Sequence, residues 1–193
     1  MAGANTSGLR LVMLGPPGSG KGTQAKILAE KLGVPAISTG RMLRRAVESG
    51  SELGQRVEAI VASGALVDDD TMAEVVRERL ARDDAAAGYL LDGYPRTQAQ
   101  ADMLTRILAD SGSALDAVVL IEVPEDELVR RSLARQRADD TEEIVRHRQG
   151  VYREKTAPLI EYYESLGLLR RIDGDSSIED VNASICAALG VES

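Results

Sequence analysis

Aromatic residues, cysteine and histidine are scarce in this sequence. Its 193 residues include no phenylalanine or tryptophan, one cysteine and one histidine. The single cysteine, Cys186, excludes an intrachain disulfide and a zinc site built from cysteines, and we interpret it as a small buried apolar residue. His147 stands between two arginines and is expected on an exposed helix face, so catalysis by a histidine triad has little support.

Long hydrophobic runs and an excess of positive charge are also absent. No segment approaches the ~18 consecutive apolar residues that suggest a membrane-spanning helix. The formal net charge of −8 argues against a general binder of nucleic acid or of anionic membrane surfaces. Residues 1–8 are small and polar and carry no signal-peptide pattern, so we expect a flexible tail and a cytoplasmic protein. No long apolar stripe requires a partner, and we expect a monomer.

Short apolar runs alternate with helical patterns along the chain. We expect strands at residues 11–14, 35–38, 88–92, 117–123 and 168–172. We expect helices at residues 24–32, 40–48, 52–63, 71–82, 98–109, 125–135, 142–166 (with a kink near Pro158) and 178–189. This alternation is typical of a single α/β domain, here with a five-stranded parallel sheet and helices on both faces. Two successive helices without a strand between them, in the stretch 40–67, predict a small helical subdomain inserted into that domain.

The segment GPPGSGKGT at residues 15–23 joins the first expected strand to the first expected helix. Its glycines allow backbone N–H groups to turn toward an anion, and the positive end of the helix dipole points at the same place. Lys21 adds a full positive charge suited to the β- and γ-phosphates of a nucleotide. The general P-loop pattern has a hydroxyl residue directly after the lysine, whereas here Gly22 comes before Thr23.

Two further motifs stand where expected strands end. In LLDGYPR, Asp92 is expected at the carboxyl edge of the sheet, where a carboxylate can hold magnesium directly or through water. Gly93 and Pro95 form a turn that directs Arg96 inward, although an exposed arginine after a simple turn fits the same pattern. In STGRMLR, a helix begins after the strand and carries Arg44 one turn along.

Arginines crowd the segments on both sides of residues 138–141. Glu142 and Glu143 stand close enough to compensate this charge, which would make the cluster a solvated surface. Alternatively, a loop flanked by arginines on two helices can close over polyphosphate, because guanidinium groups bind phosphate oxygens in pairs. The clustered arginines are Arg130, Arg131, Arg135, Arg137, Arg146 and Arg148.

Together, these motifs closely resemble those of the adenylate kinase family, in its form with a short lid. The resemblance covers residues 9–189 and includes GPPGxGKGT, ISTG, LLDGYPR, RADDT and YxxxTAPL. Gly22 is the family's own version of the P-loop. The resemblance implies a P-loop NTPase-type fold and a phosphotransferase that converts MgATP and AMP into two ADP. The implied partners are therefore small nucleotides, and Mg²⁺ bound with ATP is the implied cofactor.

The resemblance also implies a role for individual residues. Catalysis would involve Lys21, Arg96, Arg135, Arg137 and Arg148. ATP would contact Gly18, Ser19, Gly20, Lys21, Gly22, Thr23, Arg131, Arg135 and the backbone of Ser176. AMP would contact Thr39, Arg44, Ala65, Leu66, Val67, Gly93, Tyr94, Pro95, Arg96, Gln100, Arg137 and Arg148. Asp92 would hold Mg²⁺ through water. Residues 38–67 would form the AMP-binding subdomain. Residues 134–140, with Asp139 and Asp140, would form a short lid that lacks the length and the cysteines for zinc.

A UMP/CMP kinase of the same family is the nearest alternative. Such relatives usually carry alanine in place of Thr39 and asparagine in place of Gln100. A threonine hydroxyl and a longer amide suit the amino group and ring nitrogen of adenine, so we expect AMP as the acceptor. A GTPase needs an Asn-Lys-x-Asp motif, and neither Asn5 nor Asn182 precedes a lysine. A non-catalytic nucleotide sensor is the third alternative, which an assay for ADP would separate.

Overall fold

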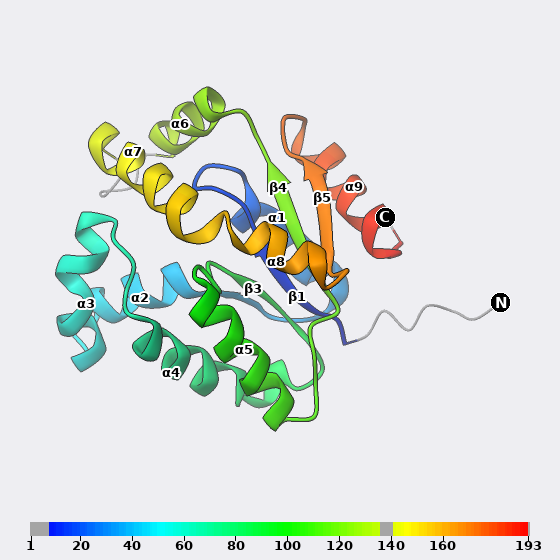
Figure 1. Ribbon diagram of the computed structural model, residues 1–193, viewed down its shortest axis with the longest axis horizontal. Coiled ribbons are helices and arrows are strands. Elements are labelled where there is room, and N and C mark those ends of the chain that lie inside the picture. Colours follow the sequence, from blue (N-terminus) through cyan, green and yellow to red (C-terminus); the bar gives the residue numbers. More distant parts are fainter. Residues whose placement is uncertain (1–7, 136–140, 193) are drawn as a thin grey trace.

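The computed structural model describes residues 8–135 and 141–192, which form a central sheet covered by helices (Figure 1). The strands are β1 (Arg10–Leu14), β2 (Ala36–Ser38), β3 (Tyr89–Asp92), β4 (Ala117–Glu122) and β5 (Leu169–Asp173). All neighbouring strands run parallel, in the order β2-β3-β1-β4-β5. The predicted five-stranded parallel sheet is therefore confirmed, and the carboxyl ends of its strands meet at one edge.

Two hydrophobic cores cover the two faces of this sheet. On β1, Leu11 and Met13 join one core, whereas Val12 and Leu14 join the other, because successive side chains of a strand point to opposite faces. The α-helices are α1 (Lys21–Leu32), α2 (Thr39–Glu48), α3 (Glu52–Ser63), α4 (Asp69–Leu80), α5 (Gln98–Asp110), α6 (Glu125–Ala134), α7 (Glu142–Val151), α8 (Leu159–Ser165) and α9 (Ile178–Leu189). Burial on both faces explains why the strands are continuous apolar runs.

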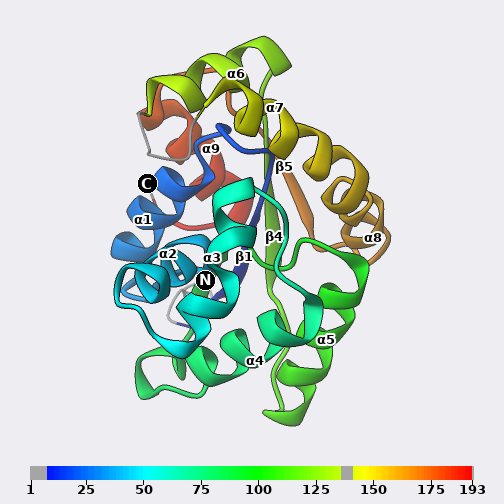
Figure 2. The same ribbon diagram turned by 90° about the vertical axis from the view of Figure 1, so that its left-hand side faces the viewer.

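The helices α2 and α3 lie against each other at the side of the sheet, on the same side of the molecule as α7 (Figure 2). A Cβ atom at Gly54 would clash with the carbonyl oxygen of Ala46, so the two helices approach too closely there for a larger residue. The side chain of Ser51 caps α3 by accepting a hydrogen bond from the N–H of Gly54. Along the chain the two helices follow β2 with no strand between them, and we call them the insertion; that they form a separate subdomain stays a prediction.

The prediction of one long helix over residues 142–166, kinked near Pro158, is wrong in detail. It is divided into α7, a π-helical turn (Tyr152–Thr156) and α8, so the irregularity precedes Pro158. The N–H of Ala157 donates to the carbonyl oxygen of Tyr152 at 2.8 Å, which is a bond across five residues. A proline cannot donate to the helix ladder and its ring crowds the preceding turn, and this widened turn accommodates it.

Two other local features were not predicted. The helix α4 begins two residues earlier than expected, because the side chain of Asp68 accepts a hydrogen bond from the N–H of Thr71 at 2.8 Å. A short 3₁₀ turn (Asp83–Ala85) leads into β3.

The predictions for the two scarce residues are confirmed, since Cys186 is fully buried and His147 is exposed. Within the described ranges, no helix combines the length and the apolar character needed to cross a membrane.

Candidate active site

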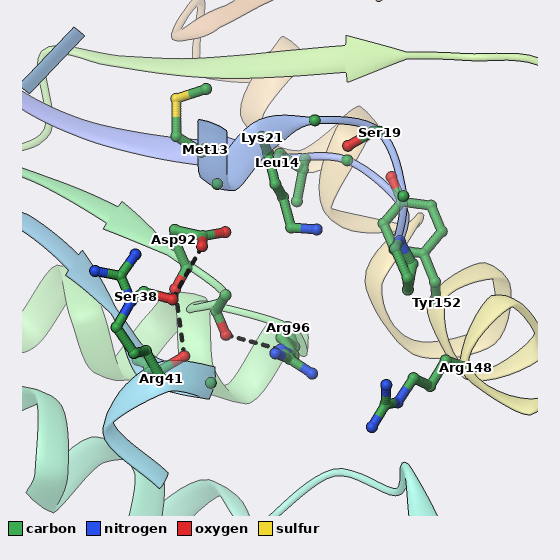
Figure 3. A pocket seen from close by; sticks show the side chains of 18 of the residues that line it. Met13, Leu14, Ser19, Lys21, Ser38, Arg41, Asp92, Arg96, Arg148 and Tyr152 are labelled. Atoms are coloured by element: carbon green, nitrogen blue, oxygen red, sulfur yellow. Dashed lines mark hydrogen bonds between the residues drawn. The ribbon is translucent and has the colours of Figure 1, made fainter. Parts of the chain in front are cut away.

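A cleft of about 930 Å³ opens at the carboxyl edge of the sheet (Figure 3). Its walls come from the loop after β1, the start of α2, the end of α3, the loop after β3, α7 and the loop after β5. Ligands of open α/β folds bind at this edge. The cleft therefore lies where the fold itself predicts a binding site.

The glycine loop forms one wall of the cleft. A Cβ atom at Gly18 would lie 2.5 Å from the carbonyl oxygen of Leu128 on α6, and its φ of +90° is one that glycine adopts most easily. The side-chain amide of Gln149 on α7 donates to the carbonyl oxygen of Pro17 at 2.7 Å. Two helices thus fix the outer part of the loop, while Lys21 begins α1 and extends its ammonium into the cleft (Figure 3).

Asp92 ends β3 directly beside the start of α1. Its Oδ2 atom accepts a hydrogen bond from Ser38 Oγ at 3.0 Å, and a Cβ atom at Gly22 would lie 3.3 Å from the same oxygen. The carboxylate therefore borders the glycine loop. Among the described residues no three His, Cys, Asp or Glu side chains gather to hold a metal ion. One carboxylate beside a phosphate loop fits Mg²⁺, which keeps most of its ligands as water and phosphate oxygen.

Arg96 is held at three points in the loop after β3. Its Nε atom donates to the carbonyl oxygen of Gly93 at 2.8 Å, and its backbone N–H donates to Gln100 Oε1 at 2.8 Å. Its carbonyl oxygen accepts a hydrogen bond from Thr156 Oγ1 at 2.8 Å. These bonds fix both the backbone and the guanidinium, which points into the cleft (Figure 3).

The charge of Arg96 is one of several that converge on the cleft. Burial is the main cause that lowers the pKa of its guanidinium, and the charge of Asp92 opposes this effect. The charges of Arg148 and Arg44 lower the same pKa further. A Cβ atom at Gly40 would lie 3.5 Å from Arg44 Nη1 and 3.8 Å from Arg96 Nη2, so these two guanidinium groups border the same glycine. Such crowding of like charges is costly unless an anion occupies the space between them. The arrangement is suited to binding phosphate groups.

The contact between Arg148 and Gly64 joins α7 to the end of α3. A Cβ atom at Gly64 would lie 3.0 Å from Arg148 Nε and 3.1 Å from Ile144. The insertion and the arginine-bearing helix therefore meet at the cleft. Sequence reasoning did not single out Gly64, and its position as a helix-ending glycine gives no sign of this contact.

Comparisons with known proteins agree with this geometry. Residues 13–168 match the sequence model of a family described as Adenylate kinase. An adenylate kinase of Thermobifida fusca is 50% identical over 185 residues, which covers 94% of this chain and 98% of the relative. Adenylate kinases of Corynebacterium glutamicum (50% identity, 94% and 99% coverage) and Thermus thermophilus (51% identity, 95% and 98% coverage) are similar to the same extent. The chain belongs to the adenylate kinase family.

Membership of the adenylate kinase family confirms the predicted enzyme class and activity, a phosphate transfer between ATP and AMP. No finding favours a UMP/CMP kinase. The roles assigned to individual site residues remain predictions. The positions of these residues in the structure are as follows. Arg131 bridges α6 to the loop after β5, since its Nη1 atom donates to the carbonyl oxygen of Gly174 at 2.9 Å. The loop after β5 brings Ser176 to the cleft, and Arg135 also lines the cleft.

Most residues assigned to AMP by the family resemblance also line the cleft. They are Thr39, Arg44, Ala65, Leu66, Val67, Gly93, Pro95, Arg96, Gln100 and Arg148. Tyr94 is the exception, because its side chain is fully buried in the core, where burial raises the pKa of its hydroxyl to about 12. The assignment of Tyr94 to the AMP site stays a prediction, for which the backbone between Gly93 and Pro95 is available at the cleft. Arg137, Asp139 and Asp140, and with them most of the lid at 134–140, lie outside the described residues.

Several residues that line the cleft were not predicted from the sequence, and Tyr152 and Ile178 are two of them. Tyr152 lines the cleft beside the glycine loop, at the first position of the π-helical turn (Figure 3). Ile178 begins α9 and is 52% exposed at the cleft. The YxxxTAPL motif contains Tyr152 and was a usable signal. An isolated isoleucine at the start of a helix, such as Ile178, gives no such signal in the sequence.

Proposed function

We propose that this enzyme joins MgATP and AMP in the cleft and transfers the terminal phosphate in line to give two ADP. The observation that carries the assignment is the convergence of Lys21, Arg96 and Arg148 on one cleft from three separate elements. Two polyanions must meet for this reaction, and fixed cations are the means of bringing them together. A fold with a single histidine is sufficient, because the reaction needs no general base. The attacking phosphate of AMP has a second pKa of about 6 and is mostly dianionic at neutral pH.

The ATP half of the site is proposed to lie on the glycine loop and α6. The backbone N–H groups of residues 18–23 and the start of α1 would surround the β- and γ-phosphates, with Lys21 adding its charge. Arg131 and the backbone of Ser176 would contact the adenine of ATP. Arg135 and Arg137 would close over the phosphates from the lid.

Mg²⁺ bound with ATP is proposed to lie next to Asp92. The carboxylate ends β3 between Ser38 and Gly22 and offers oxygen atoms, the ligand type that this ion prefers. Thr23 is exposed and also lines the cleft. When bound, the ion supplies positive charge to the phosphate oxygens during transfer.

The AMP half is proposed to comprise residues 38–67 and the loop after β3. Arg44, Arg96 and Arg148 would bind the acceptor phosphate, while Thr39 and Gln100 would face the base. The backbone of residues 65–67 would form the side of this pocket. Closure of this subdomain and of the lid would exclude water, so that ATP is not hydrolysed.

The enzyme is further proposed to be a cytoplasmic monomer that acts on small nucleotides, not on nucleic acid or membranes. The net charge of −8 supports this view. Among the described residues, Leu166 and Ile178 are the large hydrophobic side chains that are strongly exposed. Ile178 lies at the cleft, so the part of the chain that the structure describes presents no broad apolar surface to a partner.

A coupled assay for ADP tests the assignment of the acceptor. Wild-type enzyme would be given ATP with AMP, CMP or UMP in parallel, and Mg²⁺ would be withdrawn with a chelator in a matched series. AMP should give the highest kcat/KM, and chelation should reduce the rate strongly. Comparable rates with UMP or CMP would contradict the assignment of Thr39 and Gln100 to an adenine pocket.

A further inference from the structure

The side-chain amide of Gln100 is held at both of its ends. The side chain is 1% exposed and lines the cleft. Its Nε2 atom donates to Asp69 Oδ1 at 2.9 Å, and its Oε1 atom accepts from the backbone N–H of Arg96 at 2.8 Å. Thr97 Oγ1 donates to the same carboxylate oxygen at 2.9 Å. Asp69 therefore binds both the cap and the first turn of α5.

The chemistry of these partners fixes the direction of the amide. An ionised carboxylate can only accept hydrogen bonds, and a backbone N–H can only donate one. The nitrogen of the amide must therefore face Asp69 and the oxygen must face Arg96. A flipped amide would oppose like groups at both ends and leave them unsatisfied in a buried place. The orientation follows from the partners and not from a choice between similar atoms.

After these bonds, the amide of Gln100 keeps one N–H and one oxygen lone pair. A 6-aminopurine presents a donor at its amino group and an acceptor at the adjacent ring nitrogen. A 6-oxopurine presents the same two positions with donor and acceptor exchanged. A glutamine that could flip would satisfy either base, whereas a fixed glutamine satisfies only one of them.

We propose that Asp69 is a positioning residue that sets base selectivity, by holding the Gln100 amide in the orientation that accepts a 6-aminopurine and rejects a 6-oxopurine. This inference rests on the proposed placement of AMP against Gln100. It goes beyond that placement because it assigns the selectivity to a carboxylate on another helix. Asp69 itself need not touch the nucleotide.

The carboxylate of Asp68, next to Asp69 in the chain, has a different role, which makes Asp68 a matched control. Asp68 is exposed and caps α4 by accepting from the N–H of Thr71 at 2.8 Å. Asp69 is half-buried and directs its side chain across to α5, 28 and 31 residues further along the chain. Removing either carboxylate disturbs the start of α4. Only the loss of Asp69 releases Gln100.

The test compares AMP with IMP, which differs from AMP at the 6-position of the purine. In Asp69→Ala, KM for AMP should rise and the ratio of kcat/KM for AMP over IMP should fall about tenfold, the size of one lost hydrogen bond to a charged group. KM for ATP should stay unchanged. Asp69→Asn should keep the ratio, since its amide oxygen still accepts both bonds. Asp68→Ala should lower the melting temperature and leave the ratio unchanged.

Several results would overturn the proposal. They are an unchanged ratio in Asp69→Ala, a fall of equal size in Asp68→Ala, and a loss of the ratio in Asp69→Asn. Gln100→Leu separates the two levels of the argument. If this variant keeps the wild-type ratio, the placement of AMP against Gln100 fails. If it abolishes the ratio while Asp69→Ala does not, only the role of Asp69 fails.

A measurement on the wild-type protein covers the case in which Asp69→Ala does not fold. Labelled and deuterated enzyme should show a scalar coupling through the hydrogen bond between the Arg96 amide nitrogen and the Gln100 side-chain carbonyl carbon. That coupling requires the amide oxygen to face Arg96. Its absence in the free and AMP-bound enzyme would overturn the fixed orientation.

Discussion

At the scale of single residues, position on a helix decides whether an arginine belongs to the site. Arg148 and Arg146 both lie on α7, two residues apart. Arg148 lines the cleft and lowers the pKa of Arg96, whereas Arg146 is exposed and pairs with Glu142 at 2.8 Å. Exposed pairs one helical turn apart contribute little to stability. The two residues therefore offer a direct comparison of a site charge with a surface charge.

We expect Arg148→Ala to reduce turnover about 100-fold or more, the scale found when one group that stabilises transition-state charge is removed. Arg146→Ala should stay within twofold of the wild-type rate. Steady-state ADP formation at saturating ATP and AMP measures both, with circular dichroism to verify folding. Similar rates in the two variants would remove Arg148 from the mechanism.

Lys21→Met should abolish most of the activity for the same electrostatic reason. The methionine keeps the aliphatic stem, so the fold should be unaffected and only the charge at the phosphate loop is lost. The change is measured as kcat in the ADP assay together with the melting temperature. Near-wild-type turnover would show that the backbone of the loop alone is sufficient.

At the scale of elements, the π-helical turn between α7 and α8 is connected to two arginines of the site, Arg148 and Arg96. Arg148 lies on the helix that precedes the turn, and Thr156 at the end of the turn donates to the carbonyl oxygen of Arg96 at 2.8 Å. Thr156 is 6% exposed. One irregular element thus fixes the spacing of two charges that are distant in sequence, which is a common role of π-turns at functional sites.

Thr156→Val should lower the free energy of unfolding by about 1–3 kcal/mol, because the buried carbonyl loses its partner. It should also lower kcat, since the Arg96 loop becomes less well fixed. Thr105→Val is the control, because its exposed hydroxyl only bonds within α5 at 3.0 Å. Denaturant unfolding and the ADP assay would be run on both variants. Equal effects would show that Thr156 acts only as a core residue.

Motifs local in sequence were the predictable part of the site. The glycine loop follows β1, Asp92 ends β3 and Arg96 lies in the loop after it. The alternating pattern places all of these strand ends at one edge of the sheet. Contacts between distant segments were not predictable, because nothing in the sequence pairs Asp69 with Gln100. The burial of the Tyr94 side chain was not predictable for a related reason. A residue within a functional motif can turn its side chain into the core, and only the packing of the neighbouring helices shows this.

At the scale of the whole molecule, an acidic protein binds acidic ligands through a local field. The net charge is −8, so long-range attraction of nucleotides cannot come from the molecule as a whole. Instead, Arg44, Arg96 and Arg148 converge at one cleft, from the insertion, the loop after β3 and α7. The field depends on how closely the insertion approaches α7, and the contact between them is at Gly64.

Two glycines allow a test of how the close approach of the insertion to α7 affects the site. Gly64 and Gly50 both end helices of the insertion with positive φ, +78° and +64°. Alanine at either position costs about 1–2 kcal/mol of backbone strain. A Cβ atom at Gly64 would also press on Arg148 at 3.0 Å, whereas one at Gly50 meets nothing within 4 Å.

We therefore expect the two alanine variants to lose similar stability and very different amounts of activity. Gly64→Ala should raise KM for AMP and lower kcat, because the insertion and α7 are pushed apart and Arg148 is displaced. Gly50→Ala should keep wild-type kinetics at temperatures well below its melting point. Parallel thermal unfolding and AMP titrations separate strain from displacement. If the kinetics of both variants follow their stability alone, the contact at Gly64 does not couple the two halves of the cleft.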